Sequence, residues 1–294
     1  MRQFIVEKGK EKNGLIKLDG KDYRYLRQVL RVRNGDMISV RLPDGSLKNA
    51  TVAMVDEGAR VVTLQVCAAT GETITRGVQA EEIAGGVAAA GTGQVEYWLF
   101  QFLPRPQKFE LIVRQATECG VACIVPVIGD FTEKSSVQAL LGSKRDRLDR
   151  IIKEARQQSG SPVDTRVLEP LSLEKAVELW NTESTVVEPV ETTAEHREEG
   201  RDVAFVLSER DDCSGNLRAT VATAQEVGPI KRAAIAVGSE GGISPDEVKY
   251  LEEKGLFVPI HFAVNILRCE TAALYGIAAV QTEINNRLSG QAGQ

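Results

Sequence analysis

The stretch AAIAVGSEGGISPDEVKYLEEKGLFVPIHFAVNILRCETAALYGIAAVQ, residues 233–281, decides the fold. It opens with an apolar run at 233–237, which predicts a buried strand, and then passes through a glycine-rich turn. Ser244, Pro245 and Glu247 supply an N-cap, a proline at the first helical position and a capping-box carboxylate. These residues predict a helix that closes at Gly255, followed by a strand at 256–260 and a final helix over 268–287.

The same alternation of strand and helix extends back along the chain to Val95. Apolar runs predict further strands at 95–103, 122–128 and 203–207, whereas amphipathic segments predict helices at 107–119, 143–158 and 172–180. Gly120 is expected to end the first of these helices. Because strands that alternate with helices form a parallel sheet covered on both faces, residues 95–294 predict an α/β domain.

Residues 1–70 follow a different pattern, that of a small β-barrel. Alternating runs on either side of Pro43-Asp44-Gly45 predict a hairpin within 37–56, and a further strand is expected within 59–66. One basic helix interrupts these strands at 23–32, and Gly35 can end it. Its apolar face is expected to carry Tyr23, Leu26, Val29 and Leu30, and its other face Arg24, Arg27 and Arg31.

The charge of the chain is divided unevenly between these regions. The net charge is −5, but residues 1–70 alone carry +5, so the remaining residues carry −10. A basic amino-terminal unit on an acidic body is compatible with binding to nucleic acid. An ordinary charged surface explains the same numbers.

Several classes of protein are disfavoured by composition. No apolar run approaches the length of a membrane helix, and the amino-terminal residues have no signal core, so a cytoplasmic location is expected. The five cysteines are an odd number at irregular spacings, which predicts free thiols and no metal site. Residues 71–94 are rich in Gly, Ala and Thr and predict a linker or insertion, whereas 181–202 is an acidic, solvated excursion.

The predicted carboxyl ends of three strands carry the residues suited to a binding site. Ser208-Glu209, residues 238–242 and residues 261–265 follow these strands, where open parallel sheets bind ligands. Gly238, Gly241 and Gly242 allow the backbone to approach a ligand closely, although a tight strand-to-helix turn also uses glycines. His261 lies nearby but has no partners spaced for a triad or a metal site.

These residues resemble a known family. The unit of strand, GSEGG, ISPDEV and helix, followed by ILRCETAALYGIAAVQ, is similar to the carboxyl-terminal signature of the bacterial ribosomal RNA uridine-N3 methyltransferases, the RsmE family of the SPOUT superfamily. YLRQVLRVRNGDMISV resembles the family's PUA-like barrel, and LPRPQKFELIVRQATECGVACIVPV resembles the start of its catalytic domain. KEARQQSGSPV resembles its central motif, so the resemblance covers nearly the whole chain.

The resemblance implies a domain whose carboxyl-terminal segment threads a trefoil knot and whose knot loops hold S-adenosylmethionine. It also implies a homodimer that methylates N3 of one uridine in small-subunit ribosomal RNA. The implied cofactor-binding residues are Leu207, Ser208, Glu209, Val237, Gly238, Glu240, Gly241, Gly242, Ile260, Phe262, Ala263, Leu267, Thr271 and Ala272. The expected RNA-binding residues are Arg24, Arg27, Arg31 and Lys108.

Three positions depart from the family pattern. Ser239 stands where the family has proline, Val264-Asn265 where it has Pro-Arg, and Phe131 where it has arginine. Arg268 is the best remaining cation to stabilise a uridinate anion, and Glu270 is the nearby carboxylate that can serve as a base. Alternatively, Arg268 and Glu270 form an ion pair that shapes the start of the last helix.

Two other functions fit the same residues. One is a SPOUT methyltransferase that modifies the ribose 2′ oxygen, and the other is an RNA-binding protein without activity. The small residues Ala272, Ala273, Gly276 and Ala279 on the last helix permit close packing, either within the chain or across a dimer interface.

Overall fold

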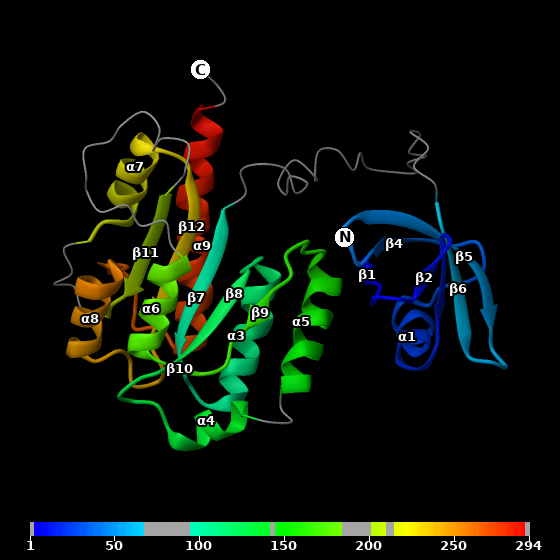
Figure 1. Ribbon diagram of the computed structural model, residues 1–294, viewed down its shortest axis with the longest axis horizontal. Helices are drawn as coiled ribbons and strands as arrows, with labels where there is room; N and C mark the ends of the chain where they lie inside the picture. Colours follow the sequence, from blue (N-terminus) through cyan, green and yellow to red (C-terminus); the bar gives the residue numbers. More distant parts are fainter. Residues whose placement is uncertain (1–2, 68–94, 142–144, 184–200, 210–214, 292–294) are drawn as a thin grey trace. The chain divides into compact units, whose positions relative to one another are not determined.

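A computed structural model describes residues 3–67, 95–141, 145–183, 201–209 and 215–291 (Figure 1). The chain divides into two compact units. One contains Met1–Val87 and Arg156–Pro162, and the other contains Ala88–Ala155 and Val163–Gln294. The predicted linker at 71–94, most of the acidic excursion, His196 and Cys213 lie outside the described residues.

The first unit is built on a six-stranded sheet of order β1-β4-β5-β6-β3-β2. Its strands are β1 (Gln3–Ile5), β2 (Glu11–Lys12), β3 (Leu15–Leu18), β4 (Met37–Arg41), β5 (Leu47–Asp56) and β6 (Val61–Val66). β1 pairs parallel with β4, and all other pairs are antiparallel. β4 and β5 form the hairpin expected around Pro43, and the arrangement fits a barrel-like domain.

The helical segment of this unit consists of α1 (Gly20–Arg24) and the π-helical segment η1 (Tyr25–Leu30). Leu26 is fully buried as expected, but Val29 is 54% exposed, so its placement on the apolar face was wrong. The prediction assumed a regular α-helix, whereas the wider i→i+5 turn of a π-helix changes which side chains share a face. The segment ends at Arg31, which adopts a left-handed conformation, and not at Gly35.

The second unit contains a parallel sheet of order β10-β8-β7-β12-β11-β13, with β9 paired to β8 (Figure 1). Its strands are β7 (Glu96–Phe102), β8 (Cys123–Ile128), β9 (Arg166–Val167), β10 (Leu171–Ser172), β11 (Arg201–Leu207), β12 (Ile230–Val237) and β13 (Val258–Ile260). All of the pairs between these strands are parallel, as the alternation of elements predicted.

The helices between these strands cover both faces of the sheet. They are α3 (Pro106–Glu118), α4 (Lys134–Leu140), α5 (Arg145–Ser159), α6 (Leu173–Glu183), α7 (Leu217–Val227), α8 (Pro245–Gly255) and α9 (Cys269–Gln291). Tyr97 and Leu99 of β7 belong to the core that α3 and α9 cover, whereas Trp98 and Phe100 belong to the core under α6 and α8. This alternation along one central strand leaves the ends of the strands as the place for a site.

Two of the small residues of α9, Ala273 and Gly276, pack against other elements of the same chain. A Cβ atom on Gly276 would lie 2.6 Å from Leu207 Cδ1 and 3.3 Å from Ile235 Cγ2. Ala273 is also buried in the core. These two residues therefore let α9 approach β11 and β12 closely.

Some elements differ from those expected. The helix α4, the helix α7 and the short strands β9 and β10 were not anticipated. The capping box of α8 is present and the helix ends at Gly255 as expected, although the left-handed residue that follows it is Leu256. None of the helices in the described parts of the chain has the length and hydropathy of a membrane span.

Candidate active site

A cavity of about 580 Å³ lies at the carboxyl ends of β11, β12 and β13. Three segments form its walls: the residues after β11, the glycine turn after β12, and the chain that joins β13 to α9. Its volume is in the range of small-molecule sites. The expected position of the site, at the carboxyl edge of the sheet, matches this cavity.

Most of the expected cofactor-binding residues line the cavity. They are Leu207, Ser208, Glu209, Val237, Gly238, Glu240, Gly242, Phe262, Leu267 and Ala272. Gly241, Ile260, Ala263 and Thr271 are not among the lining residues. Of these four, Ile260 acts as a support, because its carbonyl accepts a hydrogen bond from the backbone N–H of Ser208 at 3.0 Å.

The glycine turn is too tight for side chains at Gly238. A Cβ atom there would lie 2.7–2.9 Å from backbone atoms of Gly242. The turn closes through a hydrogen bond from the N–H of Gly242 to the carbonyl of Ser239 at 3.0 Å, and Gly242 has a φ of 81°. The glycines thus satisfy a backbone requirement and at the same time leave backbone groups open to the cavity.

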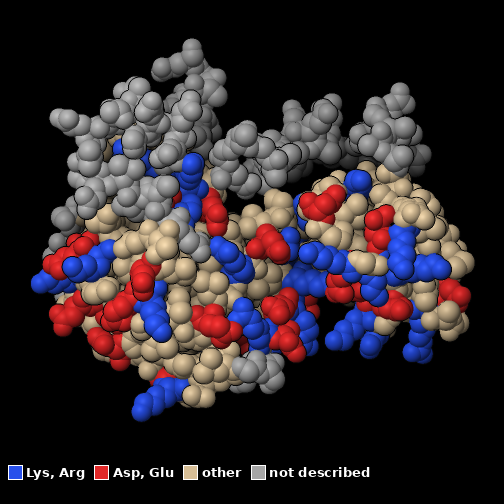
Figure 2. Space-filling view, in the orientation of Figure 1, with Lys and Arg blue, Asp and Glu red and all other residues tan. Residues whose placement is uncertain are grey.

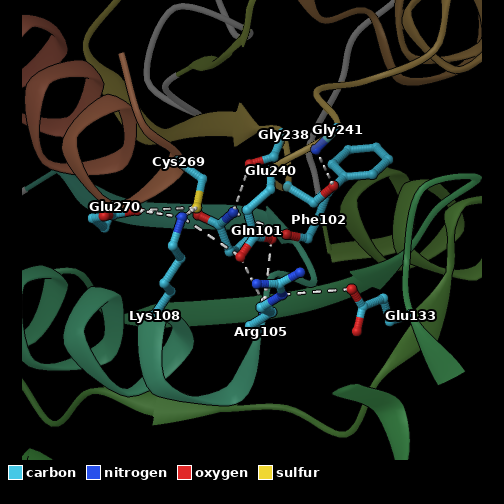
Figure 3. Close-up of polar contacts among 11 residues, drawn as sticks. Gln101, Phe102, Arg105, Lys108, Glu133, Gly238, Glu240, Gly241, Cys269 and Glu270 are labelled. Carbon is cyan, nitrogen blue, oxygen red and sulfur yellow. Dashed lines mark hydrogen bonds and ion pairs between the residues drawn. The ribbon is translucent and has the colours of Figure 1, made fainter. Parts of the chain in front are cut away.

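Gln101, a residue that the sequence did not single out, holds the start of this turn. It is fully buried at the end of β7, beside Val237 in the sheet. Its Nε2 donates to the carbonyl of Gly238 at 3.0 Å and lies 3.3 Å from the carbonyl of Val237 (Figure 3). The central strand therefore fixes the point at which β12 enters the glycine turn.

Lys108, which the sequence predicts to contact RNA, forms ion pairs with carboxylates at the cavity wall (Figure 3). Its Nζ lies 3.6 Å from Glu240 Oε1 and 3.3 Å from Glu270 Oε2. Glu240 also accepts a hydrogen bond from the backbone N–H of Arg105, the N-cap of α3. Through these contacts α3 ties the glycine turn to the first turn of α9.

The ion pairs favour the charged form of Lys108. Burial would lower the pKa of Lys108, but the carboxylates of Glu270 and Glu240 raise it. Burial and the contact with Glu270 raise the pKa of Cys269 to about 12, so its thiol stays protonated and donates to Glu270. Burial would raise the pKa of Glu270, but its backbone hydrogen bonds, Cys269 and Lys108 lower it.

These contacts argue against Glu270 as a general base. Its carboxylate pairs with Lys108 and accepts from the Cys269 thiol, and it is not among the residues that line the cavity. The expected alternative, an ion pair between Glu270 and Arg268, is also absent from the described ion pairs, because Glu270 pairs with Lys108. A positioning role is what the geometry leaves for Glu270.

Arg268 lies where a cation can meet a ligand. It is exposed, it lines the cavity, and it is not paired with any carboxylate in the described parts of the chain. The next residue begins α9, and the carbonyl of Arg268 accepts hydrogen bonds from the N–H groups of Thr271 and Ala272 in the first turn of that helix.

Other lining residues were missed or left undecided by the sequence. Pro245, Val248 and Glu252 of α8 line the cavity, and their spacing of three and four residues is that of one helical face. His261 also lines it, and its Nδ1 lies 3.2 Å from the carbonyl of Ser208. Because a carbonyl can only accept, this contact places the proton on Nδ1.

The thiols and carboxylates of the described residues do not gather into a metal site. No group of three His, Cys, Asp or Glu side chains among them is arranged to hold an ion. Cys67, Cys119, Cys123 and Cys269 carry free thiols.

The chain is thus an α/β protein with a cavity of small-molecule size at the carboxyl edge of a parallel sheet. A family model of the RNA methyltransferase domain matches residues 92–281, and the chain belongs to this RNA methyltransferase family. The ribosomal RNA small subunit methyltransferase E of Bacillus subtilis is 25% identical over 97% of this chain and 98% of its own length.

Solved structures share the fold. A ribosomal RNA small subunit methyltransferase E from Neisseria gonorrhoeae, bound to S-adenosyl methionine, is 22% identical with a TM-score of 0.66, over 96% of this chain and 97% of that one. A methyltransferase of Legionella pneumophila in complex with the same cofactor is 18% identical with a TM-score of 0.64, over 96% of each chain. The α/β fold expected from the sequence is thus confirmed.

Proposed function

We propose that this enzyme methylates N3 of a uridine in small-subunit ribosomal RNA and that S-adenosylmethionine is its methyl donor. The relatives named as ribosomal RNA small subunit methyltransferases support the RNA class. The observation that carries the proposal is the cavity at the ends of β11, β12 and β13, with Arg268 exposed at its wall.

The cavity fits S-adenosylmethionine. Its walls combine apolar side chains such as Leu207, Val237 and Phe262 with backbone groups of the glycine turn, which suits an adenine ring. Glu209 and Glu252 place carboxylates at the same cavity, where they suit a ligand that carries positive charge. When bound, S-adenosylmethionine supplies an electrophilic methyl group.

The chain's own task is to make the uridine a nucleophile. N3 carries a proton in neutral water, and loss of that proton to solvent water leaves negative charge on the base, which attacks the donor's methyl group as the thioether leaves. We assign Arg268 to the stabilisation of this charge, since among the described residues that line the cavity it is the cation that is exposed. Lys108 and Glu270 hold the wall in place through their ion pair.

Mapping of modified nucleosides tests this function directly. Ribosomal RNA from cells with and without the gene is hydrolysed, and N3-methyluridine is expected only where the protein is present. If a 2′-O-methyl nucleoside is instead the one that disappears from RNA of cells without the gene, the protein is a ribose methyltransferase. Unchanged RNA together with no binding of S-adenosylmethionine in calorimetry would indicate an RNA-binding protein without activity.

Finer features of the family remain part of the proposal. They are a PUA-like first domain at 1–70, a linker or insertion at 71–94, a knotted second domain at 95–294, a homodimer and a cytoplasmic location. Support for the homodimer comes from Ile266, 84% exposed, and Val264, 44% exposed, because an interface at the site would cover these apolar side chains. Sedimentation analysis of the purified protein measures its oligomeric state.

We also propose that the first unit docks RNA, through Arg24 and Arg31. Both are exposed, and basic side chains project from the part of this unit that contains α1 (Figure 2). Arg27 is different, because it donates to the carbonyl of Val32 at 2.7 Å and pairs with Glu57 at 2.6 Å. Of the three arginines expected to bind RNA, Arg27 is thus held within its own unit.

The double substitution Arg24→Gln and Arg31→Gln is expected to weaken RNA binding. It should also reduce the slope of log affinity against log salt concentration by the amount that about two lost phosphate contacts produce. Fluorescence anisotropy with labelled RNA, titrated at several salt concentrations, measures both effects. Arg27→Gln is the matched control. It should lower the melting temperature, because it removes the bonds to Val32 and Glu57, but it should leave the salt slope of RNA binding close to that of the unmodified protein. Equal slopes for the double variant and the unmodified protein would show that this face only solvates the unit.

A further inference from the structure

An exposed aromatic side chain stands beside the active-site cavity. Phe131 follows β8 at the carboxyl edge of the sheet and is 51% exposed. Its side chain packs against Gly241 of the glycine turn, since a Cβ atom on Gly241 would come within 2.7 Å of Phe131 Cβ and 2.9 Å of its Cγ. The neighbours Glu240 and Gly242 both line the cavity.

The turn that carries Phe131 is held firmly on both sides. The N–H of Asp130 donates to Glu247 at 2.7 Å, and Ser244 donates to the carboxylate of Asp130 at 2.6 Å. The N–H of Gly129 donates to the hydroxyl of Thr132 at 3.0 Å. These bonds tie the turn to the capping box of α8, so the exposed ring is presented on a fixed backbone.

A cation accompanies the ring on the same rim. Arg105 pairs with Glu133, two residues beyond Phe131, with its Nε 3.5 Å from the carboxylate (Figure 3). The Arg105 side chain is 70% exposed, and its backbone N–H donates to Glu240 of the glycine turn. An exposed ring thus contacts Gly241 of the glycine turn, and a residue with an exposed guanidinium contacts Glu240 of the same turn.

We propose that Phe131 stacks on a base of the substrate RNA at the active site and that Arg105 binds the adjoining phosphate. An unstacked base offers a flat face to an aromatic ring, whereas the phosphate needs a cation within reach. Because the backbone that carries the ring is already fixed, the ring loses less conformational entropy on stacking than a ring on a flexible turn would lose. This proposal rests on the RNA methyltransferase function proposed above and adds two residues that receive the nucleotide.

The two residues predict separate effects on RNA binding. Phe131→Leu keeps an apolar contact with Gly241 but removes the ring, and it is expected to weaken RNA affinity about 5- to 150-fold at any salt concentration. Arg105→Gln is expected to reduce the salt slope by about one contact. Leu111→Ala is the control, because Leu111 is an exposed apolar side chain on α3. It should change neither the RNA affinity nor the salt slope.

Phe131→Trp tests stacking without reference to activity. The chain has two tryptophans, Trp98 and Trp180, and both are buried in the core. The new indole is therefore the exposed one in the active-site unit, and its fluorescence should be quenched when RNA is added. It should also retain RNA affinity close to that of the unmodified protein, because the aromatic face is kept.

Three measurements decide the outcome. Unchanged RNA affinity in Phe131→Leu, or an indole in Phe131→Trp that RNA does not quench, overturns the proposal. So does an equal loss of S-adenosylmethionine affinity in Phe131→Leu, which would show that the ring only packs the glycine turn. These results differ from failure of the proposed function, in which the unmodified protein itself transfers no methyl group to RNA.

Discussion

Arg268→Ala is expected to lower the single-turnover rate of methylation by about 10²–10³-fold, by analogy with the removal of one oxyanion donor. The residue is exposed at the cavity and is assigned to negative charge that develops on the uracil ring. Since this charge appears chiefly in the transition state, the affinity for S-adenosylmethionine and the melting temperature should remain nearly unchanged. Rapid-quench assays at saturating RNA and cofactor measure the rate.

The matched control is Arg218→Ala, because Arg218 is an exposed arginine of α7 that is not among the cavity-lining residues. Its rate should equal that of the unmodified protein. A normal rate for Arg268→Ala would remove this residue from the chemistry. Asn265, which also lines the cavity, would then be the next residue to substitute.

Gly238→Val is expected to weaken S-adenosylmethionine binding by at least about 100-fold. Its Cβ would lie 2.7 Å from the backbone carbon of Gly242, so the turn would have to open. Because the turn forms one wall of the cavity, opening it displaces the backbone groups offered to the ligand. Isothermal titration calorimetry measures the affinity, and circular dichroism verifies that the variant is folded.

Valine substitutions at two other glycines are controls that test whether the loss of cofactor affinity is specific to Gly238. At Gly58 the nearest neighbour of an added Cβ is Asp56 Oδ1 at 3.5 Å, so Gly58→Val should leave cofactor affinity intact. At Gly241 the added atom meets the Phe131 side chain and not backbone, so Gly241→Val should have a smaller effect than Gly238→Val. Full cofactor affinity in a folded Gly238→Val variant would contradict the assignment of this turn.

Local signals in the sequence were enough to predict most of the second unit. The capping box before α8 and the apolar runs of β7, β8 and β12 are strong because each depends on a few neighbouring residues. The helix α7 was missed although Asn216 caps it, with its side chain accepting from the N–H of Ala219. Val221 is the one residue of α7 that the structure records as buried, and Leu217 and Ala224 are only partly buried against the core, so the apolar face of this helix consists mostly of small side chains.

The position of the cavity was predictable from the sequence, whereas the contacts that hold its walls were not. Glycines at a strand end and a polar segment before a helix mark the edge of a parallel sheet where ligands bind. The role of Lys108 was not predictable, since it meets Cys269 across 161 residues of sequence. The hydrogen bonds of Gln101 to the glycine turn span 136 and 137 residues, and no local pattern encodes them.

These long separations along the sequence have a consequence during synthesis of the protein on the ribosome. Gln101 needs β12 beside it, and Lys108 needs the first turn of α9, so the walls of the cavity meet only after the last helix has been synthesised. Parallel sheets closed by such distant pairings fold slowly, because the entropy of loop closure is lost before the contacts form. A nascent chain still held by its ribosome before α9 emerges therefore lacks a site for the methyl donor. Translation itself delays the enzyme's first turnover.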